Sequence, residues 1–176
     1  MIGLNVGSGQ RPFPSTPELK WVNIDSQARW NPDVVCDGAN LVGSQGFTFT
    51  DNSVDYVVLI QVLEHFGCGE GEGLIKEAYR VLKPGGSLIL SVPDLRALCT
   101  EWLHGKKLDT QLFVTCLYGA YMGDEADRHK WAFTSESLLA FLKAGPWKSV
   151  TIGRCPDISG SSIPHDWWIL EAECIK

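Results

Sequence analysis

The sequence places a glycine turn directly after its first apolar segment. Residues 2–6 read Ile-Gly-Leu-Asn-Val, and Gly7, Ser8 and Gly9 follow at once. Glycines at the end of a strand let a ligand approach the main chain, because no Cβ stands in the way. The next segment that reads as a strand ends in Asp25, whose carboxylate can accept hydrogen bonds from both hydroxyls of a ribose. This pairing predicts a site for a nucleoside or nucleotide.

The residues after the glycine turn argue against a phosphate in that ligand. A dinucleotide site needs a third glycine and a helix whose N-terminus faces the pyrophosphate. Gln10 and Arg11 stand where that glycine is expected, and Pro12, Pro14 and Pro17 follow them. Prolines disfavour a regular helix through this connection. A ligand with adenine and ribose but no phosphate, such as S-adenosylmethionine, therefore fits better than NAD.

Small or polar residues also end the other predicted strands. In an open parallel sheet, ligands lie beyond the carboxyl ends of the strands, where the strand order reverses. Asp25 and Asp37 also have a purely structural reading, because an aspartate before a small residue can cap a local turn. The candidate residues at these strand ends, besides Asp25, are Ser26, Asp37, Gly38, Ala39 and Gln61.

The order of apolar segments predicts the sheet that brings these strand ends together. Short runs rich in β-branched residues occur at 2–6, 21–24, 33–36, 54–60 and 87–92. Several are apolar throughout, which is typical of parallel strands covered on both faces. A helix is predicted within 71–83, ended by Pro84, Gly85 and Gly86. The alternation predicts an α/β fold, a Rossmann-like doubly wound sheet that is mostly parallel, with helices on both faces in three α/β/α layers.

After the fifth predicted strand, the apolar residues follow a helical spacing. Apolar stripes at 95–103 and 112–120 predict two helices separated by polar residues. We interpret residues 95–131 as a helical insertion that forms an acceptor pocket or lid. No linker divides the chain, so residues 1–176 are predicted to form a single domain.

The C-terminal part predicts one more helix and two strands. Thr134 is placed to cap a helix over 135–144, and Gly145 and Pro146 follow its end. Strands are predicted at 148–153 and 167–175. Because the connections are short, these strands are expected to form an antiparallel hairpin that closes one sheet edge.

Composition narrows the possible partners and location. The formal net charge is −6, so no overall basic field favours a nucleic acid. No segment is long and apolar enough to span a bilayer, and no signal peptide is recognisable. The six cysteines form no CxxC pair and no zinc-finger spacing, which indicates reduced thiols. We therefore expect a cytoplasmic location and no metal site.

Five stretches, in this order and spacing, resemble the class I S-adenosylmethionine-dependent methyltransferases of the small methyltransferase type 11 kind. "LNVGSG" is similar to the family's first glycine motif, and "NID" at 23–25 to the ribose-binding end of its second strand. "DVVCDGANL" with "FTDNSVDYVVLIQVLEHF" resembles the adenine loop and fourth strand. "EAYRVLKPGGSLILSVPDL" and "HKWAFTSESLLAFLKAG" resemble the helix with the fifth strand and the late helix. The resemblance covers most of the chain.

The resemblance implies S-adenosylmethionine as cofactor and assigns parts of it to residues. Gly7, Ser8 and Gly9 would face the methionine portion, and Gln61 the sulfonium side. The ribose would lie at Asp25, next to Ser26, and the adenine at Asp37, Gly38 and Ala39.

The sequence also departs from that family. Many relatives carry Asp or Glu at the position of Asn5, so a water-mediated contact with the cofactor's ammonium would lack a full charge. Many also begin with an extra helix, which is missing before residue 2. A lid would then have to come from elsewhere, with 95–131 as the best candidate, or it is absent. The missing elements make a homodimer or a contact with a partner protein possible.

Three residues are candidates for proton transfer. Glu64 and His65 lie just past the fourth strand, where they either face the substrate or cap the next segment. His129 either lines the acceptor pocket or lies in a solvated loop. One of the three could take the proton of a hydroxyl acceptor, whereas a carboxylate or thiolate needs no base.

The implied function is transfer of the sulfonium methyl, by in-line displacement, onto a small-molecule or glycan acceptor. Aromatic residues of the insertion suit such an acceptor: Trp102, Tyr118, Tyr121 and Trp131. Two alternatives remain open at this point. One is a non-catalytic module that binds S-adenosylmethionine and serves a partner protein, and the other is a nucleotide-dependent oxidoreductase.

Overall fold

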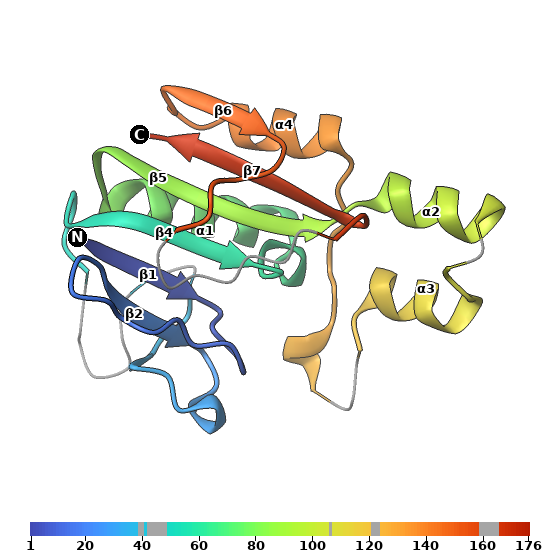
Figure 1. Cartoon of the computed structure of the whole chain (residues 1–176), viewed down its shortest axis with the longest axis horizontal. Helices are drawn as coiled ribbons and strands as arrows, with labels where there is room; N and C mark the ends of the chain where they lie inside the picture. The colour runs from blue at the N-terminus through green and yellow to red at the C-terminus, as the bar shows by residue number, and fades with distance from the viewer. Residues whose placement is uncertain (39–40, 42–48, 106, 121–123, 159–165) are drawn as a thin grey trace.

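The computed structural model describes residues 1–38, 41, 49–105, 107–120, 124–158 and 166–176. In this part of the chain, seven strands form one sheet with the order β3-β2-β1-β4-β5-β7-β6 (Figure 1). The strands are β1 (Ile2–Val6), β2 (Lys20–Asp25), β3 (Val34–Val35), β4 (Val54–Ile60), β5 (Leu82–Pro93), β6 (Ser149–Ile152) and β7 (Ile169–Ile175).

The sheet is parallel from β3 to β5, and β7 runs antiparallel to both β5 and β6. This confirms the predicted Rossmann-like, mostly parallel sheet with a C-terminal antiparallel part. The chain leaves β1 toward β2 on one side and later places β4 on the other side of β1. The strand order therefore reverses between β1 and β4, which is where ligands bind in such sheets.

Four α-helices and three short 3-10 turns connect the strands in the described residues. They are α1 (Cys68–Val81), α2 (Leu95–His104), α3 (Thr110–Tyr118), α4 (Ser135–Lys143), η1 (Ala28–Trp30), η2 (Leu63–His65) and η3 (Glu125–Asp127). The Thr134 side chain accepts a bond from the Ser137 N–H, so Thr134 caps α4 as predicted. Helix α1 ends at Val81, before the predicted Pro84-Gly85-Gly86 stop, because the chain enters β5 directly at Leu82.

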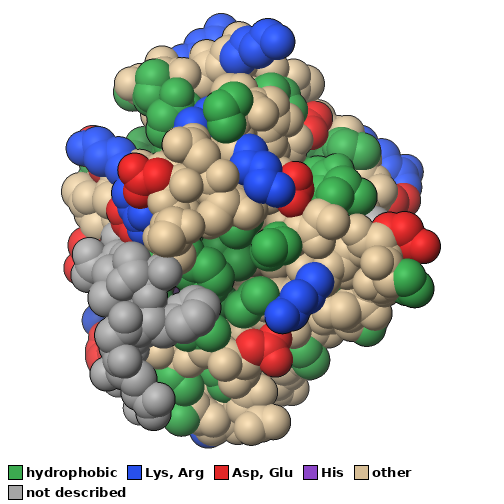
Figure 2. Space-filling model, turned by 90° about the vertical axis from the view of Figure 1, so that its left-hand side faces the viewer, with side chains coloured by type: hydrophobic (Ala, Val, Ile, Leu, Met, Phe, Trp, Pro, Cys, Tyr) green, Lys and Arg blue, Asp and Glu red, His purple; other side chains and the backbone are tan. Residues whose placement is uncertain are grey.

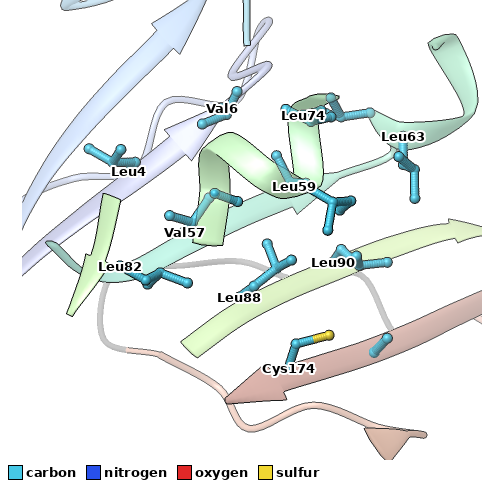
Figure 3. Packing of buried hydrophobic residues seen from close by; sticks show 14 of the residues in the cluster. Leu4, Val6, Val57, Leu59, Leu63, Leu74, Leu82, Leu88, Leu90 and Cys174 are labelled. Atoms are coloured by element: carbon cyan, nitrogen blue, oxygen red, sulfur yellow. The ribbon is translucent and has the colours of Figure 1, made fainter. Parts of the chain in front are cut away.

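The main core lies between the sheet and the helices of one face. Leu74 of α1 packs with Val57, Leu59 and Leu90 of the central strands (Figure 3). Leu138 and Leu142 of α4 belong to the same cluster, so α1 and α4 cover the same face of the sheet. This burial fixes the direction of β4 and hence the position of the residues that follow it.

Loops rather than long helices cover the opposite face. A second cluster contains Phe13, Leu19 and Trp21, packed with Val58 and Ile89 of the central strands. Within residues 7–19, all of which the structure describes, no helix forms, in agreement with the prolines there. The fold class is confirmed, and among the described residues the proline-containing segment, rather than a helix, contributes Phe13 and Leu19 to this second cluster.

Helices α2 and α3 lie beyond the carboxyl end of β5, and both chain termini lie at the opposite end of the sheet (Figure 1). Figure 2 shows that opposite end, where Lys, Arg, Asp and Glu side chains are interspersed with hydrophobic ones. No continuous basic surface is visible among the described residues of this face. None of the described helices combines the length and apolar character that crossing a membrane requires.

Candidate active site

Two cavities, each of about 420 Å³, open at the carboxyl ends of β1 and β4. They share Gly7, Gly9 and Gln61, so they are neighbours on the two sides of the glycine turn. We call the first the Asn5 cavity, and it is also lined by Asn5, Ser8, Gln10, Arg11, Phe13 and Trp168. We call the second the Asp25 cavity, and its lining includes Asp25, Ser26, Asp37, Gly38, His65 and Lys130.

The glycine turn is held tightly at its first residue and is open at its third. The N–H groups of Gly7 and Ser8 both donate to the carbonyl of Ile24, at 2.8 and 2.9 Å. Gly7 has φ +72°, and a Cβ there would stand 2.5 Å from Cγ2 of Val62. Gly9 has φ +47°, and a Cβ there would meet no described atom within 4 Å. Position 7 therefore requires glycine for both space and conformation, whereas position 9 leaves its main chain open to a ligand.

Asp25 joins the glycine turn to the end of β2. Its Oδ2 accepts a bond from the Gly9 N–H and its Oδ1 from the Gln27 N–H, both at 2.8 Å. The carboxylate thus orders the local turns, as the structural reading proposed, and it lines the Asp25 cavity as well. Because each carboxylate oxygen can accept more than one bond, capacity remains for a ligand's hydroxyls.

Gln61 occupies the wall between the two cavities. Its backbone is left-handed, with φ +54°, although it is not a glycine. Its N–H donates to the carbonyl of Ser91, and its Nε2 lies 3.4 Å from the Ser91 hydroxyl oxygen. Such a conformation costs roughly 1–2 kcal/mol and is concentrated at functional sites. The conformation turns the chain sharply at the end of β4, beside Gly7.

Asn5 lines its cavity but uses its amide to hold the protein together. Its Nδ2 donates to the carbonyl of Arg11 at 3.1 Å and to Oδ1 of Asn23 at 2.9 Å. The Asn23 Oδ1 in turn accepts from the Phe13 N–H at 2.7 Å. A carboxylate at position 5 could not donate to either acceptor, so these two contacts require an amide.

Replacing Asn5 with Asp is therefore expected to destabilise the fold. One buried and one partly buried hydrogen bond disappear, and a negative charge faces two oxygen acceptors, so we expect a loss of roughly 2–4 kcal/mol in the free energy of unfolding. Urea denaturation would measure this loss. Asn52→Asp is the matched control, because Asn52 is exposed and its Oδ1 accepts from Lys176. Equal stability of both variants would contradict the structural role of Asn5.

Glu64, His65 and His129 lie together beyond the end of β4. The carbonyl of Glu64 accepts bonds from the N–H groups of Lys130 and Trp131, which draws the segment before α4 against η2. The rings of His65 and His129 meet edge to face with centroids 4.8 Å apart. All three candidates for proton transfer are thus neighbours, but of the three only His65 lines the Asp25 cavity.

Burial shifts the protonation of all three groups toward neutral forms. It raises the pKa of the Glu64 carboxyl to about 8, because the carboxyl is fully buried. Burial also lowers the pKa of His65, and burial together with the neighbouring His65 lowers the pKa of His129 to about 4. Without another charged species present, near neutral pH the two imidazoles carry a free lone pair and the carboxyl keeps its proton.

Of the other predicted cofactor-binding residues, three line the Asp25 cavity and one lies outside the described residues. Asp37, Gly38 and Ser26 line the Asp25 cavity, whereas Ala39 lies outside the described residues. Sequence reasoning missed Arg29 and Trp30, which line the same cavity from η1. Their position a few residues beyond Asp25 was the available signal.

Arg29 also closes one edge of the Asp25 cavity. Its guanidinium pairs with Asp124, and the guanidinium carbon stands 4.7 Å from the centre of the Trp30 ring. Residues of η3 line the cavity next to this ion pair. The contact therefore joins η1 to the residue that precedes η3 across the cavity.

Solved structures share this fold at low sequence identity. An S-adenosylmethionine-dependent methyltransferase from Archaeoglobus fulgidus aligns at 13% identity with a TM-score of 0.62, covering 99% of this chain and 86% of the other. A possible histamine N-methyltransferase from Thermotoga maritima aligns at 16% identity with a TM-score of 0.62, covering 99% and 81%. The 1,6-didemethyltoxoflavin-N1-methyltransferase of Burkholderia thailandensis, solved with 1,6-didemethyltoxoflavin and S-adenosylhomocysteine, aligns at 16% identity with a TM-score of 0.58, covering 99% and 70%. Among curated proteins, none matches the chain.

The family model of the methyltransferase domain matches residues 16–90, a stretch that contains Asp25, Asp37 and Gln61. This stretch therefore matches a methyltransferase domain, and the whole chain shares the fold of solved S-adenosylmethionine-dependent methyltransferases. The match begins after the glycine turn, so it does not include Gly7 and Gly9. These two residues are candidates for ligand binding because they line both cavities.

Proposed function

We propose that this protein is an S-adenosylmethionine-dependent methyltransferase that binds its methyl donor across both cavities. The adenosine lies in the Asp25 cavity, where the Asp25 carboxylate accepts the ribose hydroxyls and Asp37 and Gly38 border the adenine. The methionine part lies in the Asn5 cavity, over Gly7 and Gly9. The supporting observation is that the two cavities meet at Gly7, Gly9 and Gln61, where a ligand extending through both would place its sulfonium.

The acceptor is proposed to be a small molecule or a glycan. The Asp25 cavity extends from Gln61 toward His65, Phe66 and Lys130, and cavities of this size suit small ligands rather than extended chains. The insertion at 95–131 is proposed to act as the lid, because Glu125 and Asp127 of η3 border this cavity. A structural neighbour solved with a small molecule and S-adenosylhomocysteine is in line with this class of acceptor.

Positioning supplies most of the rate in this proposal. The methyl group is already activated by the positive sulfur, so an in-line approach within the closed cavity is the main requirement. For a hydroxyl acceptor, a member of the cluster formed by Glu64, His65 and His129 takes the proton that the hydroxyl loses. His65 is the member best placed to contact the acceptor, because its ring lines the cavity.

The experiment is transfer of labelled methyl from S-adenosylmethionine to a fractionated cell extract. We expect label in the small-molecule or glycan fraction with the wild-type protein and none with Asp25→Ala. Label confined to peptides or nucleic acid would contradict the proposed acceptor class. Binding of S-adenosylhomocysteine without transfer to any fraction would instead support a non-catalytic binding module.

A cytoplasmic location is proposed from the cysteines, all six of which are free thiols in the structure. The possible homodimer or partner protein stays a prediction from the sequence.

A further inference from the structure

Glu64, His65 and His129 form a compact set of potential metal ligands. One ligand atom from each residue lies within 4.8 Å of those of the other two. The set joins η2 to the segment before α4, and residues 66–128 separate the two histidines. No short sequence spacing could reveal this set, which is why no metal site was expected from the sequence.

The carboxylate of Glu64 lacks any hydrogen-bond partner among the residues that the structure describes. The residue is completely buried, and both Oε1 and Oε2 are unsatisfied. A buried carboxylate without partners costs several kcal/mol, so it is either protonated or compensated by a positive charge. No described Lys or Arg forms an ion pair with Glu64, and the ammonium of Lys130 pairs with Glu70. The position therefore suits a bound cation.

The two imidazoles are oriented as metal-binding histidines commonly are. Nδ1 of His65 lies 3.2 Å from the carbonyl oxygen of Arg128, and Nδ1 of His129 lies 3.1 Å from that of Cys116. A carbonyl can only accept, so each Nδ1 carries the proton and each Nε2 keeps its lone pair. A main-chain carbonyl on the second ring nitrogen is the usual partner that fixes a metal-binding histidine.

We propose that Glu64, His65 and His129 bind a divalent transition-metal ion, with Zn²⁺ as the best match. Two imidazoles and one carboxylate form a ligand set of catalytic zinc sites, which keep a fourth position open, whereas Mg²⁺ prefers oxygen ligands. Ligands of tetrahedral zinc at 2.0–2.1 Å are roughly 3.4 Å apart, so the three side chains must approach by little more than an ångström.

The ion would border the site of methyl transfer, because His65 also lines the Asp25 cavity. This part of the inference rests on the proposed function. An acceptor hydroxyl that occupies the open position would lose its proton more readily, since a bound metal lowers the pKa of a coordinated oxygen. The proton would pass to solvent water, because Glu64, His65 and His129 would act as metal ligands rather than as bases. Metal binding itself does not depend on the acceptor.

Metal binding can be tested on the full-length protein after treatment with a chelator. Zn²⁺ is titrated in competition with a chromophoric chelator, and Co²⁺ is used for ligand-field spectra. We expect one Zn²⁺ per chain for the wild type. Changes in outer-shell partners already weaken metal sites 10- to 100-fold, so Glu64→Gln and His129→Gln should weaken binding by more than about 100-fold. The matched control His104→Gln should leave the affinity unchanged, because His104 is exposed at the end of α2.

Two outcomes would overturn the inference. One is a wild-type protein that takes up no Zn²⁺, or binds it with the same affinity as the Glu64 and His129 variants. The other is a Co²⁺ spectrum with thiolate charge-transfer bands, since that would place the ion on cysteines. If Glu64→Gln does not fold, His129→Gln decides alone. Neither readout uses methyl transfer, so a wrong acceptor class leaves this test intact.

Discussion

Asp25→Ala is expected to remove nearly all affinity for S-adenosylhomocysteine. The variant loses the carboxylate that would accept both ribose hydroxyls. Hydrogen bonds to charged groups contribute roughly 1.5–3 kcal/mol each, so two of them correspond to about 100- to 10,000-fold in the dissociation constant. The same carboxylate orders Gly9, whose N–H it accepts at 2.8 Å, so the turn over the ligand loosens as well. Isothermal titration calorimetry would measure the effect.

Two further variants separate ligand contact from local order. Asp25→Asn retains one carbonyl oxygen, so its affinity should lie between those of wild type and Asp25→Ala. Asp124→Ala breaks the exposed ion pair with Arg29 at the cavity edge. This change should lower the binding free energy of S-adenosylhomocysteine by at most about 1 kcal/mol. Wild-type affinity in a folded Asp25→Ala protein would contradict the proposed ribose site.

Gly7→Ala is expected to have the largest effect on folding. The new Cβ would stand 2.5 Å from Cγ2 of Val62 and would require a positive φ of +72°. Overpacking of this kind costs about 1–3 kcal/mol, and the left-handed backbone costs another 1–2 kcal/mol. We therefore expect a loss of roughly 2–5 kcal/mol in the free energy of unfolding. The displaced turn should also abolish binding of S-adenosylhomocysteine. Urea denaturation and calorimetry would measure the two effects.

A double-mutant cycle with Val62→Ala identifies the clash. Removing the Val62 methyl groups leaves space for the new Cβ, so the double variant should be more stable than the sum of the single losses predicts. Gly9→Ala is the matched glycine control, because a Cβ at position 9 meets no described atom and only the backbone conformation is strained. It should lower the free energy of unfolding by only about 1–2 kcal/mol. Additive losses in the cycle would show that Val62 does not determine the choice of glycine at position 7.

The sequence predicts the sheet well and indicates which residues end its strands, because both depend on local patterns. The β1 and β4 boundaries agree with the predicted 2–6 and 54–60, since short β-branched runs end at polar or glycine residues. Asp25, Asp37 and Gln61 meet because parallel strands end at one edge. The prolines at 12–17 likewise predicted a connection without a helix.

Features that depend on contacts between distant segments could not be predicted in this way. The sequence does not show that Asn5 donates to Arg11 and Asn23, because a buried amide and a ligand-binding amide look alike in one sequence. It also does not show that His129 returns to Glu64 and His65 across the whole insertion. That contact depends on main-chain bonds from Lys130 and Trp131 to the carbonyl of Glu64.

A crystal structure of the protein with S-adenosylhomocysteine tests the central claim most directly. We expect the ribose hydroxyls within hydrogen-bond distance of Asp25, the sulfur beside Gln61 and the amino-acid part over Gly7 and Gly9. A ligand bound elsewhere, or a ribose that makes no contact with Asp25 while the glycine turn is covered by protein, would contradict it.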